Sequence, residues 1–534
     1  MKEFELVREE SVALASRYAE RDSMLEEMRK MFAMEWNEEP KGDWIKATMS
    51  PGAYNAVMGA VRLMTATDPQ INAVVLDAPG GDEEAEAMEL AARAMWDGSG
   101  RVTLRPAHYE IVFSALLFGE ICASVTRVSD LVALSGSGLK PGGAYARFLS
   151  AERDTPFIFT VYNPATCYGD FDQWGLRGML RRIKTTWGDV CASWGKLAED
   201  SMDRVMAPGA EVTLNDWYDW DVRSVWVDGA ARAILHDEHN LGFLPVVDQV
   251  AEGTYLFAEP ERQRYPLLYA VWKSGLWKRE NLSLTTVYSL IDALGSSPLL
   301  KRKTPAPGSA LHIDRTVPGG VVDIGVDESI EPLVEKVVDP SQWEGLKMAA
   351  RLNEESTISR QALGGQPDRG MSFSAISLLS QAGRLPLTAV KAMAGAAIGK
   401  LLGYAFQWWK VSAPGTVDRS AMWAGLRYVD ITAEDVPDQI AFSVNLEPDV
   451  PQDKLQLANV GAVLVSTGLA SKRWVRENIM MIGQSELMDE EIAREAASAP
   501  VPAAASGASV YPAGGVGSGE PLSGPMQPMT TPIG

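Results

Sequence analysis

One short loop comes close to a phosphate-binding motif. Read from Gly365, the sequence is G-x-x-x-x-G-M-S, whereas the nucleotide-binding loop is G-x-x-x-x-G-K-[ST]. Met371 takes the place of the lysine, so the loop has no point charge for the β- and γ-phosphates. Pro367 removes one backbone N–H donor, and the loop follows a helical pattern instead of a strand. We therefore predict a flexible glycine loop between two helices, and no ATP site.

Other residues that could bind metals or catalyse reactions are few and scattered. The sequence HDEH, from His236 to His239, ends a strand pattern, in which alternation puts the two histidines on opposite faces. The sequence DFDQWG begins at Asp170 like a calcium loop, but Arg181 stands at the twelfth position, where glutamate is required. The chain has four histidines and three cysteines, with no CxxC pair. These observations predict no catalytic residue, no metal site and no cofactor.

The charge balance is strongly acidic. The 534 residues include 70 acidic and 49 basic side chains, which gives a net charge of −21. Such a chain repels DNA over most of its surface and lacks the basic footprint of a conventional DNA-binding protein, so we expect no tight non-specific binding to DNA. The densest basic run, Lys301 to Lys303, is either a solvated face or a contact for an acidic partner or DNA. The isolated cysteines predict a reducing compartment, and the charged N-terminus predicts no signal peptide.

The most apolar stretch, residues 386–411, predicts a close-packed helix and not a membrane span. Lys391 and Lys400 lie inside it, and no uncharged run approaches the roughly 18 residues that a spanning helix needs. Three glycines spaced four residues apart leave room for another backbone to approach the helix. They are Gly395, Gly399 and Gly403. We expect no membrane insertion.

The first half of the chain predicts helices followed by a β-rich region. Residues 3–35 have the apolar stripe of one amphipathic helix, and two further helical stretches precede Val102. From Val102 to about Pro260, β-branched and aromatic runs alternate with turn residues, which predicts strands and hairpins. This pattern predicts an α+β protein.

Two long helices of similar length bracket a small β-rich module. The first helical pattern opens at Pro266 and ends at Gly295, and both residue types suit those positions. The second opens at Pro340, directly after the N-cap residue Asp339, and runs to about Leu363. Because β-like runs with Pro and Gly fill the segment between them, we expect an antiparallel helix pair with the module at its tip.

The rest of the chain predicts another long helix, a strand, a helical region and a tail. The helix covers residues 373–410 and is expected to kink where Gly383 and Pro386 interrupt it. The acidic stretch DQIAFSVNLEPD predicts a strand, and residues 452–497 are helical in pattern. Residues 499–534 are almost wholly Ala, Gly, Pro, Ser and Met, which predicts a disordered tail.

This order of elements resembles the portal (head-to-tail connector) proteins of tailed bacteriophages, most closely the short-tailed phage type. The stretch VYNPATCYGDFDQWGLRGMLRRIKTTWGDVCASWG is similar to their wing segment, and HNLGFLPVV to the wing element before the first stem helix. GLASKRWVRENIMMIGQSELMDEEIAREA resembles their crown helices. The likeness runs from about residue 50 to residue 497. Each motif is degenerate, so the order of the motifs carries the resemblance, and the extreme N-terminus and the tail depart from it.

The resemblance implies a portal fold whose parts follow each other along the chain. They are a mixed α/β wing (1–260), stem helix 1 (261–297), a small β-rich clip (298–338), stem helix 2 (339–363), a glycine tunnel loop (364–372), a kinked long helix that returns to the wing (373–450), a helical crown (451–498) and the disordered tail (499–534).

The resemblance also implies a structural role without enzymatic activity. Portal proteins form a homo-oligomeric ring, usually of twelve subunits, at one capsid vertex of the virion, and assemble in the host cytoplasm. Double-stranded DNA passes through the ring during packaging and ejection. The implied partners are the terminase packaging motor, the tail adaptor, the capsid protein and the scaffolding protein. A mostly negative channel wall would let the duplex slide without sticking.

The resemblance assigns roles to three groups of residues. The tunnel loop would place four residues in the DNA channel, namely Gln366, Asp368, Arg369 and Met371, and Arg369 is the expected phosphate contact. The clip would dock the motor and later the adaptor through Lys301, Arg302 and Lys303. The stem would pack between subunits, with Trp272, Leu276 and Trp277 as candidates.

Two other classes of protein stay open at this point. One is an enzyme with a degenerate phosphate loop, either an ATPase or a nuclease, and the absent lysine and the negative surface count against it. The other is a membrane-associated pore, and the lysines in the apolar stretch count against it. Particle mass and shape distinguish these classes most directly.

Overall fold

The computed structural model gives the chain an α+β fold, as the sequence predicts. It describes residues 3–36, 45–75, 81–128, 155–203, 205–239, 241–295, 299–302, 329–332, 340–357, 385–411, 420–424, 427–431, 433–446, 461–469, 471, 472, 475 and 494. The chain divides into two units, Met1–Val450 and Pro451–Gly534. In the second unit the described residues include a short helix at 461–466, and most of the predicted crown and all of the predicted tail lie outside them. All elements below belong to the first unit.

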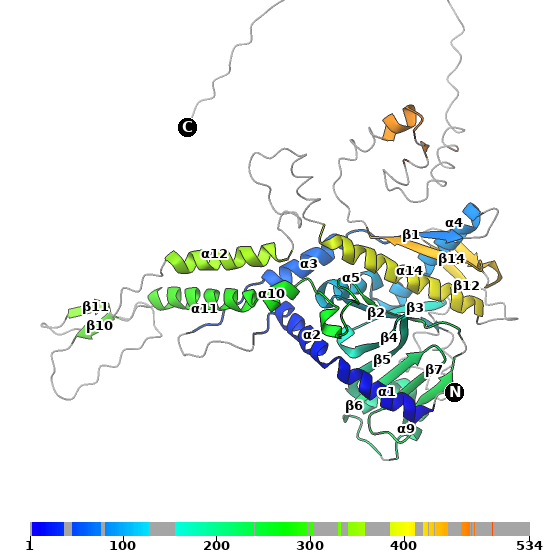
Figure 1. The fold of residues 1–534 in the computed structure, drawn as a ribbon, viewed down its shortest axis with the longest axis horizontal. Coiled ribbons are helices and arrows are strands. Elements are labelled where there is room, and N and C mark those ends of the chain that lie inside the picture. The colour runs from blue at the N-terminus through cyan, green and yellow to red at the C-terminus, as the bar shows by residue number, and fades with distance from the viewer. Residues whose placement is uncertain are drawn as a thin grey trace, which may run out of the picture. The chain divides into compact units, whose positions relative to one another are not determined.

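A five-stranded antiparallel sheet forms one layer of the first unit (Figure 1). Its strands are neighbours in chain order: β4 (Cys167–Asp172), β5 (Gly175–Thr186), β6 (Glu211–Asp219), β7 (Val222–Val227) and β8 (Leu235–Glu238). The helices α8 (Trp187–Trp194) and α9 (Lys196–Ser201) follow β5 and share an apolar cluster with the sheet. Side chains alternate between the two faces, so the cross-strand pair Leu180 and Trp217 lies opposite to the pair Met179 and Tyr218.

The N-terminal segment forms two helices, α1 (Phe4–Arg17) and α2 (Ala19–Phe32), where the sequence predicts one over residues 3–35. The helix breaks at Tyr18, whose φ of −99° and ψ of 4° depart from helical values. The Tyr18 hydroxyl donates a 2.6 Å hydrogen bond to the carbonyl of Gly169 on β4. This contact ties the break to the five-stranded sheet, and α1 packs on that sheet through the Leu180 face.

A three-stranded antiparallel sheet, ordered β3-β2-β9, forms a second layer. Its strands are β2 (Glu120–Arg127), β3 (Phe157–Tyr162) and β9 (Val246–Val250), with the 3-10 turn η1 (Pro164–Thr166) after β3. The main apolar core joins this sheet to α3 (Gly52–Met64), α4 (Gly81–Thr103) and α5 (Ala107–Phe118). The sequence predicts strands where α5 lies. Eight of its twelve residues are buried, so it has no polar face and no helical period to recognise.

The helix α14 (Leu387–Val411) crosses a β-strand at close range. That strand is β14 (Ile440–Asn445), which pairs with β1 (Gln70–Val75); nearby elements are β12 (Ser420–Ala424), β13 (Arg427–Ile431) and η3 (Ala433–Asp435). A Cβ atom added to Gly395 would collide with the carbonyl oxygen of Val444, and one added to Gly399 with that of Phe442. The predicted backbone approach is therefore confirmed at two glycines. It is wrong at Gly403, which has open space beside it.

The first of the two bracketing helices is interrupted, where the sequence predicts one helix from Pro266. After η2 (Pro260–Arg262) the chain forms α10 (Tyr269–Lys273) and then α11 (Leu276–Gly295). Gly275 lies between them with φ +71°, a left-handed conformation that ends α10. The second helix, α12 (Pro340–Glu355), begins at Pro340 as predicted but ends at Glu355, before the predicted end near Leu363.

Between α11 and α12 the described residues form a two-stranded antiparallel sheet, β10 (Leu299–Arg302) with β11 (Ser329–Pro332). The kink is predicted at Gly383 and Pro386, but residues 373–384, the first part of the predicted helix, lie outside the described part of the chain. Pro386 is in a turn directly before α14, where proline is compatible with the start of a helix.

Candidate functional site

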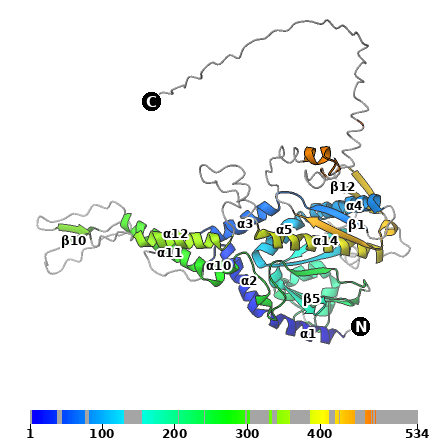
Figure 2. The same cartoon turned by 45° about the horizontal axis from the view of Figure 1, so that its top comes forward.

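The helices α11 and α12 lie side by side in both views of the ribbon (Figures 1 and 2). Glu280 on α11 is buried and accepts a hydrogen bond from the side-chain amide of Asn353 on α12. Val287, two turns further along α11, is fully buried. The hydrogen bond between Glu280 and Asn353 ties the two helices together at one level.

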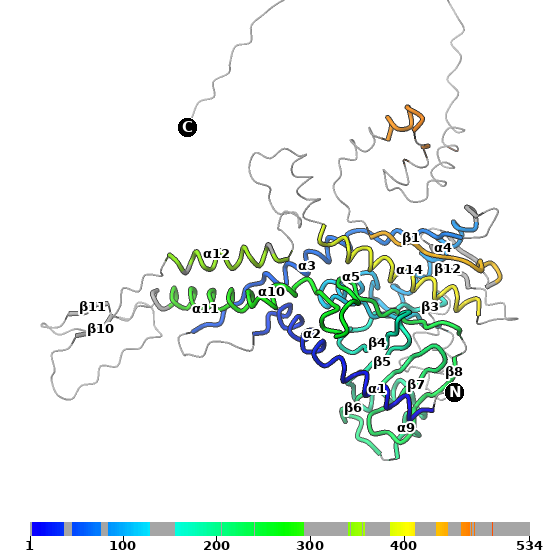
Figure 3. Tube along the Cα trace, in the orientation of Figure 1, coloured from blue at the N-terminus to red at the C-terminus, as the bar shows by residue number. Residues whose placement is uncertain are grey.

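An extended segment, residues 45–50, covers a polar side of α11 (Figure 3). Every second residue of the segment donates its backbone N–H to a side chain at every fourth residue of the helix. The bonds run from Ser50 to Asn281 Oδ1 (2.9 Å), from Thr48 to Thr285 Oγ1 (3.0 Å) and from Lys46 to Ser289 Oγ (3.0 Å). Two residues of extended chain advance about 6.6 Å and four residues of helix about 6.0 Å, so the two spacings match.

The sequence analysis did not predict this ladder of three hydrogen bonds between segment 45–50 and α11. Asn281, Thr285 and Ser289 are all buried, and their four-residue spacing puts polar groups on one stripe of the helix. Buried polar side chains need hydrogen-bond partners, and the backbone N–H groups of segment 45–50 provide them. These N–H groups gain acceptors in return. The stripe was readable from the sequence, but its partner lies more than 230 residues away along the chain.

The residues proposed for contacts between subunits lie at the start of this region. Trp277 is 6% exposed and belongs to the main core of its own chain, with Trp272 and Leu276 partly buried beside it. Their packing within one chain leaves Trp277 little surface to bury against another. The expected role of these three residues between subunits stays a prediction.

Other large apolar side chains of the helix pair are exposed. Five of them are between 38% and 63% exposed to solvent: Leu282, Tyr288 and Ile291 on α11, and Trp343 and Met348 on α12. Scattered apolar residues are normal on a protein surface, but five on two neighbouring helices mark a candidate interface.

A buried charge cluster lies in the core near the N-terminal helices. Glu120, at the start of β2, accepts hydrogen bonds from Arg264 Nη2 at 2.5 Å and from Arg21 Nη1 at 3.3 Å. All three side chains are 0% exposed. Burial alone would raise the pKa of Glu120, but the two guanidinium groups outweigh it and hold that pKa below its ordinary value. The cluster joins α2, β2 and the segment after η2.

Asp248 on β9 belongs to the same cluster. Burial raises its pKa well above the ordinary value, and the neighbouring Glu120 raises it further. Neither carboxyl oxygen of Asp248 has a donor among the described residues, so a proton on this group relieves the contact with Glu120. Cys122 lies directly opposite Asp248 on the paired strand, and burial raises the pKa of its thiol.

Glu120, Cys122 and Asp248 are close enough together for a metal ion. However, each oxygen of Glu120 already accepts from an arginine, and two buried guanidinium groups repel a cation. The arrangement is better suited to holding a proton between two carboxyl groups and to linking three elements.

The remaining site predictions fall on several parts of the chain. The tunnel-loop residues Gln366, Asp368, Arg369 and Met371 lie outside the described residues, as does Lys303. Lys301 and Arg302 are on β10, opposite Ile330 and Ser329 of β11.

The two histidines of HDEH make separate contacts. His236 Nδ1 is 2.6 Å from Ser224 Oγ, and His239 Nε2 is 2.7 Å from the carbonyl of Asp219. They do not form a common metal site with each other.

No model of a known protein family matches the chain, and no curated protein sequence matches it significantly. Among the described helices, none combines the length and the apolar character that crossing a membrane requires.

Proposed function

We propose that the chain is a subunit of a portal ring of the tailed-bacteriophage type. In this role it would assemble with copies of itself, twelve by analogy with that class, and provide a channel for double-stranded DNA. The helix pair would be the stem and the β10–β11 sheet part of the clip that docks the packaging motor and tail adaptor. No catalytic activity is part of the proposal.

The observation that carries the proposal is the helix pair itself. Two long helices follow each other with a small antiparallel sheet between them, and the pair leaves five large apolar side chains exposed. A second copy of the chain could cover these side chains, as oligomer interfaces are rich in aromatic residues and Met. The net charge of −21 supports the proposal from another side, because a negative wall favours passage of DNA over binding.

Substitutions at equally exposed positions test the proposal. Met348 on α12 is 63% exposed and Val12 on α1 is 64% exposed, and both lie on helices. We expect Met348→Glu to convert rings into monomers or small oligomers, because an interface would bury the new charge without a partner. Val12→Glu should leave the rings intact.

Size-exclusion chromatography with light scattering and negative-stain micrographs report the result. Rings of normal size from Met348→Glu would show that Met348 and its side of the helix pair are not part of an interface between subunits. A wild-type chain that stays monomeric would contradict the proposal that the chain forms a ring.

A further inference from the structure

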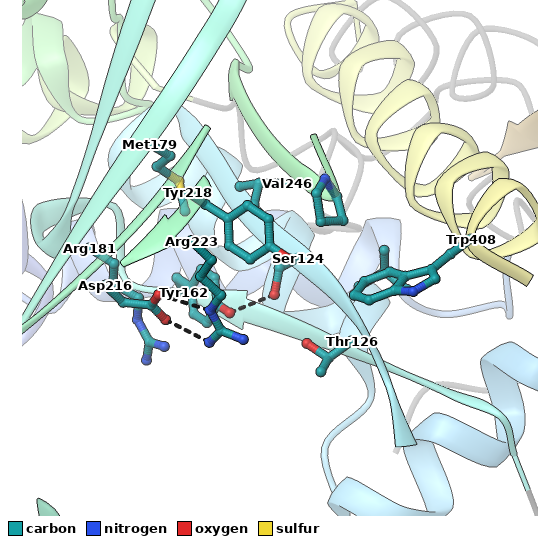
Figure 4. Close-up of a pocket in the computed structure, with 12 residues that line it drawn as sticks. Ser124, Thr126, Tyr162, Met179, Arg181, Asp216, Tyr218, Arg223, Val246 and Trp408 are labelled. Atoms are coloured by element: carbon teal, nitrogen blue, oxygen red, sulfur yellow. Dashed lines mark hydrogen bonds and ion pairs between the residues drawn. The ribbon is translucent and has the colours of Figure 1, made fainter. Parts of the chain in front are cut away.

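A small pocket lies between the two sheets and α14 (Figure 4). On one side it is lined by charged and aromatic residues of β5, β6 and β7, and on the other by hydroxyl groups of β2 and β3 and by Trp408 of α14. Its volume is about 30 Å³. Because a water needs roughly 10–15 Å³ on this measure, the pocket accommodates about two waters or one small polyatomic ion.

Strand register brings three charges to the same wall. In the strand register, Arg181 of β5 lies directly opposite Asp216 of β6, and Tyr218 of β6 lies directly opposite Arg223 of β7. Since every second residue of a strand shares a face, Arg181, Asp216 and Arg223 all lie on the pocket side of the sheet. The wall therefore carries two cations and one anion.

The one acidic side chain of this wall, Asp216, already forms an ion pair with Arg223. Arg223 donates to Asp216 from Nε at 3.2 Å to Oδ1 and from Nη2 at 3.1 Å to Oδ2, which is a two-point ion pair (Figure 4). Arg181 stacks its guanidinium 3.8 Å from the centre of the Tyr162 ring. Its Nε is buried and unpaired, and no acidic side chain of the described residues forms an ion pair with it. The pocket is left with one uncompensated positive charge.

Hydroxyl donors face this charge. The hydroxyls of Ser124 and Tyr162 are 2.5 Å apart, and one of them donates to the other (Figure 4). One proton of the pair is therefore left to donate elsewhere, and Thr126 lines the pocket beside them. A planar guanidinium flanked by hydroxyl donors is the arrangement that binds phosphate and carboxylate oxygens.

We propose that this pocket binds a small phosphate-type oxyanion, with Arg181 as its principal ligand. The pocket is too small for a nucleotide, so only the anionic group enters. A bound oxyanion would neutralise the excess charge and bridge the five-stranded and three-stranded sheets. The proposal does not depend on ring formation.

Titration of the purified full-length chain with inorganic phosphate tests the proposal. Calorimetry at constant ionic strength, with chloride as the replaced anion, should give one saturable site per chain, and phosphate should raise the Tm. Arg181→Gln should abolish both the saturable heat and the extra rise in Tm beyond the general effect of phosphate on protein surfaces.

The neighbouring residue provides a matched control. Arg182 is on the same strand but on the opposite face, where it pairs with Asp228 at 3.0 Å. Arg182→Gln should therefore bind phosphate as the wild type does. Absence of saturable binding by the wild type would overturn the proposal, whether or not the variants fold. An unchanged isotherm for Arg181→Gln would overturn it as well.

The nature of the oxyanion is settled by a parallel titration. Acetate supplies a carboxylate in place of phosphate and should bind more weakly, because it offers fewer oxygens to the hydroxyl donors. Tighter binding of acetate would make the pocket a carboxylate site and contradict the proposal in its present form.

Discussion

The buried charge cluster gives the sharpest prediction for stability. Glu120→Gln keeps the size of the side chain but removes the charge that compensates Arg21 and Arg264. The single oxygen of the new amide still accepts a hydrogen bond from one arginine, while its NH₂ group faces the donor of the other arginine. Removing one partner of a buried ion pair costs about 3–5 kcal/mol. We expect a loss of this size, which is a large share of the roughly 5–15 kcal/mol that stabilises a typical domain.

The expected change in Tm follows from the size of the unit that unfolds. The unit Met1–Val450 has an unfolding entropy of about 1 kcal/mol/K, at about 2.1 cal/mol/K per residue. A loss of about 3–5 kcal/mol should therefore lower the Tm by about 3–5 °C. Asp248→Asn is the matched control, since burial and the neighbouring Glu120 raise the pKa of this carboxyl and the amide resembles its protonated form in shape. Its Tm should lie within about 1 °C of the wild type at about pH 3, where the carboxyl is protonated in the folded and the unfolded chain, and should equal or exceed the wild type at neutral pH.

The two carboxyl groups also predict opposite dependences on pH. The pKa of Glu120 is lower in the folded chain, so its stabilisation is complete above the ordinary value of 4.5 and is lost as the pH falls through the folded value. The pKa of Asp248 is higher in the folded chain, so its effect is most favourable below the ordinary value of 3.8 and stability falls as the pH rises toward the folded value. Asp248→Asn should therefore gain on the wild type as the pH rises.

Differential scanning fluorimetry between about pH 2 and pH 8 measures both effects. Equal Tm values for Glu120→Gln and the wild type at neutral pH would refute the account of the cluster. A large drop for Asp248→Asn at neutral pH would show that its carboxyl is ionised in the folded chain, which would refute the shared proton.

Two further predictions concern the packing of α14 and α11. Gly399→Ala should lower stability by several kcal/mol or prevent folding, because the added methyl group meets a backbone carbonyl, whereas Gly403→Ala should be neutral or raise stability by about 0.5–1 kcal/mol. The Tm and the soluble yield of the two variants measure this difference. Equal values for the two variants would contradict the close approach of α14 to β14. Thr285→Val should cost about 1–3 kcal/mol, because it leaves the partly buried backbone N–H and C=O of Thr48 without their partner. Thr286→Val, at a partly exposed neighbouring position, should change stability by less than about 0.5 kcal/mol. A denaturant titration that ranks the two variants in the other order would refute the ladder.

The sequence predicted features that depend on local chemistry. The fold class, the start of α12 at Pro340, the strand β14 and the close approach at Gly395 and Gly399 all follow from residue types and their spacing. Each of these signals is complete within a few residues, so no knowledge of distant partners was needed.

The features that were missed depend on tertiary context. The helix α5 is buried on nearly all sides, so it lacks the polar face by which a helix is recognised. Gly275 fits equally well inside a long helix or at a break, and only its conformation decides between the two. The charge cluster joins Arg21, Glu120 and Arg264, which are far apart in the sequence and have no common motif.

The candidate site was predicted in part for the same reason. The helix pair was recognised from its caps, but the exposed apolar residues could not be separated from the buried ones without the packing of α11 on segment 45–50. Trp277 is the clearest example, because a large aromatic residue on a long helix suggests an interface, and here it fills the core of its own chain.

The most direct test of the portal proposal is the assembly state of the purified full-length chain. Negative-stain electron micrographs should show end-on views of a ring with an axial hole, and light scattering should give a mass near twelve times the 57.9 kDa of one chain. A monodisperse monomer or dimer, at concentrations where Met348→Glu and the wild type behave alike, would contradict the proposal.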